Sequence, residues 1–142
     1  YPERSSGGIM TTEFAWVPYT YNVEEALSHL RSSEEALEDE FMYYIYLLDE
    51  QMQLKGVVSL RDLVTSSLDQ PLSKWIDDDI AQVAPLAPQE EAAYLVAKYD
   101  LMALPVVEPE SKKMIGIVTV DDALDTVLPT AWKKKLPRFS GR

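Results

Sequence analysis

An internal duplication constrains the fold of this chain more than any other feature of its sequence. The segment 54–63 (LKGVVSLRDL) recurs sixty residues later as 114–123 (MIGIVTVDDA), with glycine, apolar, hydroxyl and acidic positions in register. Upstream, the segment 23–26 is echoed by 89–92, and the matching segments follow the same order in both halves. A chain that repeats itself at a fixed spacing is expected to build two copies of one structural unit.

The duplication divides the 142 residues into three parts. We expect a first repeat with an N-terminal lead-in over 1–68, a second repeat over 69–128, and a basic tail over 129–142. This length suffices for one ordinary domain or for two small units that share a core. A hydrophobic content of 46% and a charged content of 26% are typical of a globular chain.

Each copy is predicted to run strand, helix, strand, strand, helix. The first helix begins with a capping box of Asn22 and Glu25 and carries one apolar stripe, formed by Val23, Ala26, Leu27 and Leu30. In the second copy Pro88 suits the first helical turn, and the stripe is expected at Ala92, Val96 and Tyr99.

Short apolar runs after each helix predict the strands. Residues 43–48 and 101–107 suit buried strands, and each is followed by a polar turn and a second strand over 57–59 or 115–119. Neither copy alone offers its sheet enough covering surface. The expected fold class is therefore α/β (α+β), with two pseudo-symmetric β-α-β-β-α units packed sheet to sheet.

Composition excludes several kinds of chemistry. The chain has no cysteine and one histidine, so it offers no disulfide framework, thiolate zinc site or cysteine nucleophile. No nucleophile-base pair or glycine-rich phosphate loop is present, and we expect no enzymatic activity. Residues 1–128 carry a net charge of −16, which repels nucleic acids and attracts divalent cations, whereas 129–142 carry +5.

The repeated motif carries a family resemblance. Both copies contain glycine, two apolar residues, a serine or threonine and an aspartate three residues on, and this pattern resembles a tandem pair of CBS domains, a Bateman module. The opening residues 1–3 and 7–12, together with 89–91, resemble more narrowly the cytoplasmic CBS region of MgtE-type magnesium transporters. The resemblance implies a cytoplasmic homodimeric regulatory module joined to a transporter or an N-terminal cytoplasmic domain, with cations screening acidic faces between subunits.

Ser59 and Asp62, where a strand becomes a helix, are the first candidate site. In CBS pairs this corner holds adenosine ligands such as ATP or AMP, and Arg61 adds a partner for phosphate. The resemblance suggests one nucleotide site, with the ribose at Asp62, the phosphates at Arg61, and the base against Leu101, Ala103 and Pro105, near Tyr44. The alternatives are helix capping by the hydroxyl and plain core packing by the strand.

Acidic residues form the second candidate site. Magnesium prefers carboxylate oxygens and keeps much of its water, so a regulatory site needs few direct ligands and can lie between two chains. The alternative is a solvated face that keeps the protein soluble. The candidate ligands are Glu90, Glu91, Asp100, Asp122 and Asp125.

The chain departs from the MgtE pattern at its end. Leu128 and Pro129 interrupt the last helix, and a lysine-rich tail follows instead of an acidic connecting helix. We therefore expect a CBS pair that senses magnesium, with adenine nucleotide as a second ligand, and that controls a linked channel or host domain. Membrane contact is expected only through the host or the tail. The alternative function is an adenine-nucleotide sensor in a soluble protein without magnesium transport.

Overall fold

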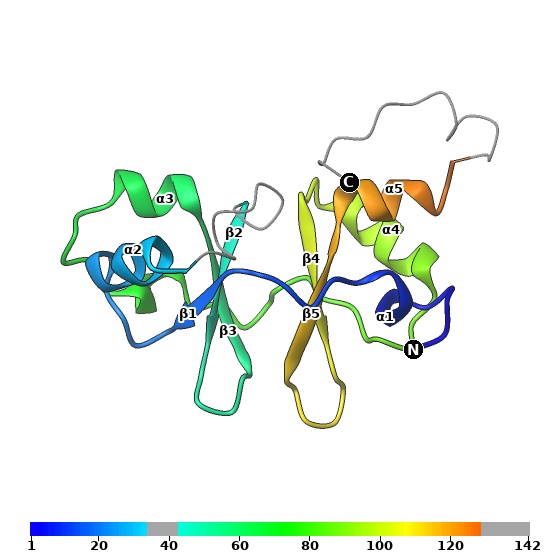
Figure 1. The fold of residues 1–142 in the computed structure, drawn as a ribbon, viewed down its shortest axis with the longest axis horizontal. Coiled ribbons are helices and arrows are strands. Elements are labelled where there is room, and N and C mark those ends of the chain that lie inside the picture. Colours follow the sequence, from blue (N-terminus) through cyan, green and yellow to red (C-terminus); the bar gives the residue numbers. More distant parts are fainter. Residues whose placement is uncertain (34–42, 129–142) are drawn as a thin grey trace. The chain divides into compact units, whose positions relative to one another are not determined.

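The computed structural model describes residues 1–33 and 43–128, which form two compact units with one sheet each (Figure 1). The N-repeat unit comprises residues 13–80 and 109–114, and the C-repeat unit comprises residues 1–12, 81–108 and the described residues from Ile115. This mixed α/β architecture with two sheets confirms the expected fold class. The basic tail lies outside the described residues.

The N-repeat unit follows the predicted order of elements. Its elements are β1 (Trp16–Pro18), α2 (Val23–Arg31), β2 (Tyr44–Leu48), β3 (Leu54–Ser59), α3 (Leu60–Thr65) and the 3₁₀ helix η3 (Leu72–Trp75). The sheet has the order β1-β2-β3, with β1 parallel to β2 and β2 antiparallel to β3. The parallel pair and the hairpin together place the carboxyl ends of β1 and β2 at one edge of the sheet.

Helix α2 begins as predicted. The side chain of Asn22 accepts a hydrogen bond from the Glu25 amide at 2.9 Å, and the Glu25 carboxylate accepts one from the Asn22 amide at 2.9 Å. This reciprocal pair satisfies two amides that a helix start otherwise leaves without partners. The buried stripe of the helix packs on a core that also includes residues of all three strands: Ala15, Val17, Val23, Ala26, Leu30, Ile45, Leu47, Val58, Leu63 and Leu72.

The C-repeat unit contains the second copy. Its elements are α1 (Ser6–Ile9), α4 (Gln89–Lys98), β4 (Ala103–Val107), β5 (Met114–Thr119) and α5 (Val120–Asp125), and β4 pairs with β5 in a two-stranded sheet. The first strand expected for this copy is reduced to one parallel bridge between Val83 and Val106. The prolines at 85 and 88 follow closely and have no amide hydrogen to donate, so strand pairing cannot continue there.

Two details of α4 differ from the sequence-based prediction. Pro88 is the residue before the helix and not a member of its first turn. Tyr99 was expected on the buried stripe, but it is 51% exposed because the helix ends at Lys98, and Ala93 takes its place beside Ala92 and Val96. The Lys98 ammonium lies over the Tyr99 ring at 5.2 Å, and their side-chain hydrogen bond raises the pKa of Lys98.

The N-terminal lead-in belongs by its contacts to the C-repeat unit. The Ser6 amide donates to the Ala87 carbonyl at 2.8 Å, and Thr11 and Ile117 exchange two backbone hydrogen bonds at 2.9 Å. In the N-repeat unit the segment after α3 packs in the equivalent way, since the Leu72 amide donates a hydrogen bond to the Tyr21 carbonyl at 2.9 Å. Each unit is therefore completed by a segment that precedes the other repeat in the chain.

Candidate functional site

The corner between β3 and α3 is organised by Ser59. Its hydroxyl oxygen accepts a hydrogen bond from the Asp62 amide at 3.0 Å, so Ser59 caps the helix. The side chains of Arg61 and Asp62 are exposed at the start of the helix. The capping alternative thus holds for Ser59. Its hydroxyl hydrogen has no acceptor within residues 1–33 and 43–128, so the hydroxyl can donate to a second group.

The equivalent corner of the C-repeat unit is built differently. The buried Thr119 hydroxyl lies 2.6 Å from a carboxylate oxygen of Asp121 and 3.0 Å from one of Asp122, and it makes no side-chain cap to the helix backbone. A hydroxyl has one hydrogen to donate, so the two carboxylates share it. Asp121 stands where Arg61 stands in the first copy, and this corner is therefore acidic instead of suited to phosphate.

The residues expected around a nucleotide base lie on two different units. Tyr44 begins β2 in the N-repeat unit, half-buried, with its ring edge-on to Tyr46 at 6.4 Å between centroids. In the C-repeat unit, Ala103 and Pro105 are buried in β4, and Leu101 packs partly buried against the core of that unit. The burial of the two β4 residues agrees with the core-packing alternative.

Two of the five acidic candidates line one hollow of the C-repeat unit. Asp122 and Asp125 from α5 face a hollow of about 350 Å³, with Gln89 at the start of α4 and residues 8–11 of the lead-in on its other sides. Asp122 and Asp125 are three residues apart, which places them on the same side of the helix. The structure therefore brings these two carboxylates together, beside the start of α4.

The other three acidic candidates are exposed on α4 or next to it. Glu90 and Glu91 lie in its first turn, and Asp100 follows its end with a left-handed φ of 52°. From Glu90 to the last helical residue, Lys98, the helix rises by about 12 Å, and Asp100 lies beyond that end. Among the described residues, no group of three or more acidic or histidine side chains is close enough to hold one metal ion.

Sequence reasoning missed two features of these surroundings. Residues 8–11 line the acidic hollow, yet the lead-in shows no clear sequence similarity to the equivalent segment near 75, so no pattern indicated this position. The second is Tyr46, which is 1% exposed and whose hydroxyl has no hydrogen-bond partner among the described residues. Burial first, and the neighbouring Tyr44 second, raise the pKa of Tyr46.

Comparison with known families identifies both halves of the chain. The family described as CBS domain matches residues 7–69 and again 73–129. Within residues 1–33 and 43–128, no helix combines the length and the apolar character that crossing a bilayer requires.

Relatives of known sequence point to one kind of transporter. The chain is 42% identical over 127 residues, 89% of its length, to the magnesium transporter MgtE of Thermus thermophilus. It is 38% identical over 131 residues, 92% of its length, to the magnesium transporter MgtE of Bacillus subtilis. The chain spans only 28% of the length of each of these relatives.

Solved structures agree with the sequence relatives. The cytosolic domain of the Mg²⁺ channel MgtE, crystallised in complex with ATP, is 42% identical with a TM-score of 0.81, over 89% of this chain and 50% of that one. The soluble part of a magnesium transporter is 34% identical with a TM-score of 0.82, over 89% of this chain and 48% of that one. The chain is thus similar in sequence and fold to the cytosolic CBS region of MgtE transporters.

Proposed function

Because this chain belongs to the CBS domain family and carries the domain twice, we propose that it is the regulatory CBS pair of an MgtE-type magnesium transporter-like protein. In this role it senses Mg²⁺ and adenine nucleotide and controls a linked channel or host domain. The observation that carries the proposal is the 42% identity, over 89% of this chain, to an MgtE cytosolic domain solved with ATP.

The nucleotide part of the proposal rests on the α3 corner. Arg61 supplies a guanidinium for the phosphates and Asp62 a carboxylate for the ribose hydroxyls, and both are exposed at a helix start that favours anions. Ser59 positions this turn through its cap. Among the residues predicted to contact the base, Tyr44 lies in the same unit and is half-buried, so we keep it in the proposal. The burial of Ala103 and Pro105 in β4 agrees with core packing.

The magnesium part rests on charge. Residues 1–128 carry a net charge of −16, and bound cations would relieve the repulsion among these carboxylates. Since Glu90 lies in the first turn of α4 and Asp100 follows its other end, about 12 Å of helical rise lies between them, and we do not assign both to one ion within one chain. We therefore assign the sensing carboxylates to an interface between two copies, where hydrated Mg²⁺ bridges them: Glu90, Glu91, Asp100, Asp122 and Asp125.

The host and the location follow from the same relationship. The chain spans 28% of its MgtE relatives, so we propose a cytosolic, non-enzymatic module within a longer transporter. The alternative is an adenine-nucleotide sensor in a soluble protein without magnesium transport, favoured by the exposed Arg61 and Asp62.

Calorimetric titration with ATP and with MgCl₂ tests both parts. We expect saturable ATP binding that weakens at least about tenfold in Asp62→Ala, while Asp69→Asn, a change at an exposed carboxylate outside the corner, leaves it unchanged. Mg²⁺ is expected to promote a dimer in light scattering, and Glu90→Gln or Asp122→Asn to raise the concentration required. Tight ATP binding without any response to Mg²⁺ would favour the alternative, and failure of both ligands would contradict the proposal.

A further inference from the structure

A second hollow lies wholly within the N-repeat unit, at the carboxyl ends of the parallel strands β1 and β2. Its volume is about 520 Å³, within the range of small-molecule sites. The register pairs Pro18 with Leu48 at these strand ends, and the residues that follow them form the walls. In α/β sheets, ligands characteristically bind beyond the carboxyl ends of parallel strands.

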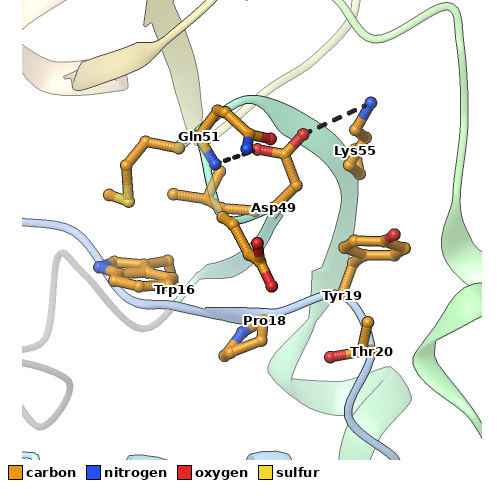
Figure 2. Close-up of a pocket in the computed structure, with 10 residues that line it drawn as sticks. Trp16, Pro18, Tyr19, Thr20, Asp49, Gln51 and Lys55 are labelled. Atoms are coloured by element: carbon orange, nitrogen blue, oxygen red, sulfur yellow. Dashed lines mark hydrogen bonds and ion pairs between the residues drawn. The ribbon is translucent and has the colours of Figure 1, made fainter.

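Two aromatic rings border this hollow. Figure 2 shows Trp16 and Tyr19 on opposite sides, with Pro18 below them in the view and Asp49, Gln51 and Lys55 above. Both rings are partly exposed, and neither contacts another ring or a cationic side chain among the described residues. Each ring therefore offers part of its surface to a ligand in the hollow, while Tyr19 also packs against the core of this unit. An aromatic face attracts a cation through its quadrupole, and tryptophan does so most strongly.

The charges around the hollow leave one carboxylate without a counter-charge. One oxygen of Asp49 accepts hydrogen bonds from the Gln51 and Gln53 amides, each at 2.9 Å, and the other lies 3.6 Å from the Lys55 ammonium. Asp49 and Lys55 thus neutralise each other while they shape the turn. Glu50 lines the same hollow, is exposed, and forms no hydrogen bond or ion pair with any described residue.

From this combination we propose that the hollow binds a small organic cation of the alkylammonium class. The ligand's charged nitrogen lies between the rings of Trp16 and Tyr19, Glu50 supplies the opposite charge, and Pro18 and Met52 contact its alkyl groups. The site is separate from the α3 corner and from the acidic residues of the C-repeat unit, so it does not depend on the function proposed above.

Choline and its neutral carbon isostere, 3,3-dimethylbutan-1-ol, are the probes for this site. We would titrate each into the ¹⁵N-labelled chain at constant ionic strength and follow the amides of Tyr19, Thr20 and Gln51 and the indole N–H of Trp16. Saturable shifts with choline, at a Kd on the order of 1 mM, and binding of the isostere at least about tenfold weaker are expected.

Three variants separate charge from fold. Glu50→Gln, at an exposed position, is expected to weaken choline binding about threefold to tenfold, and Trp16→Leu at least about tenfold, whereas Glu24→Gln on α2 leaves it unchanged. Trp16→Phe should restore part of the loss in Trp16→Leu because it returns an aromatic face. The proposal would be overturned if choline caused no saturable shifts or if the neutral isostere bound as tightly as choline. It would also be overturned if Glu50→Gln bound choline as tightly as Glu24→Gln.

Discussion

The backbone carbonyl oxygen of Trp75 lies against Gly56, on the side where any other residue would carry its β-carbon. The chain crosses β3 at this point, and an antiparallel bridge joins Gly56 to Ile76. The second copy repeats the arrangement: a β-carbon at Gly116 would lie 2.7 Å from the Thr11 carbonyl oxygen. The glycine of the repeated motif is thus required by a segment that packs across each hairpin.

Alanine at either glycine should therefore destabilise the protein. Because the obstacle is backbone in both cases, we expect Gly56→Ala and Gly116→Ala each to lower the free energy of unfolding by about 1–3 kcal/mol. Urea denaturation monitored by circular dichroism measures the loss. Gly7→Ala is the comparison, since the two nearest atoms there belong to the exposed Tyr1 ring, which can move, and the nearest backbone atom, the Pro85 carbonyl oxygen, is farther away at 3.0 Å. Equal losses at all three glycines would contradict the explanation.

The buried hydroxyl of Tyr46 makes stability sensitive to alkaline pH. The raised pKa of Tyr46 means that the folded state keeps a proton which the unfolded state releases near pH 10, so this contribution is intact below pH 10 and is lost as pH rises above it. Above pH 10 this proton release lowers the free energy of unfolding by up to about 1.4 kcal/mol per pH unit, and we expect Tyr46→Phe to abolish this part of the pH dependence.

The same substitution should also stabilise the protein at neutral pH. The Tyr46 hydroxyl has no partner among the described residues, and removing such a group relieves an uncompensated desolvation of about 1 kcal/mol. Thermal unfolding between pH 7 and pH 11 follows both effects, with Tyr43→Phe, at a 41% exposed ring, as the control. If stability falls with rising pH as steeply in Tyr46→Phe as in Tyr43→Phe, a group other than Tyr46 causes the alkaline loss of stability.

The duplication made much of this fold predictable. Helical spacing and the capping box located α2, and the repeated motif located both hairpins, because these signals depend on residues close together in the chain. The packing of the lead-in on the C-repeat unit was not predictable, since the hydrogen bond from the Ser6 amide to the Ala87 carbonyl joins residues far apart in sequence. The failed expectation for Tyr99 has a local cause, because a stripe extrapolated past the helix end points into solvent.

The candidate sites were predictable to a smaller extent. The motif located Ser59 and Thr119 at equivalent corners, but only the three-dimensional structure distinguishes a hydroxyl that caps a helix from one whose hydrogen is shared by two carboxylates. The residues next to the motif aspartate differ between the two copies, Arg61 in the first and Asp121 in the second, so the sequence itself shows that the two corners carry opposite charge there. The hollow between Trp16 and Tyr19 depends on where two strands end together, which no local pattern specifies.

Substitutions at Ser59 can separate capping from ligand binding. Ser59→Ala removes the acceptor for the Asp62 amide and should cost about 1 kcal/mol of unfolding free energy, while Ser28→Ala, at an exposed position inside α2, stays within about 0.5 kcal/mol of wild type. Ser59→Asp can cap equally well but adds a negative charge. We therefore expect it to keep stability in urea denaturation and to lose ATP affinity in calorimetry. Unchanged ATP affinity in Ser59→Asp would place the phosphates elsewhere.

Deletion of residues 1–12 tests whether the lead-in completes the C-repeat unit. The deletion removes the bonds between Thr11 and Ile117 and the bond from the Gln89 amide to the Arg4 carbonyl. Hydrogen exchange followed by NMR should then show faster exchange at Ile117 and Gln89, because their amides lose their acceptors. The Val23 and Leu72 amides bond to Gln70 and Tyr21 within the N-repeat unit and should keep their protection. A uniform loss at all four amides would mean that the lead-in stabilises the whole chain and not one unit.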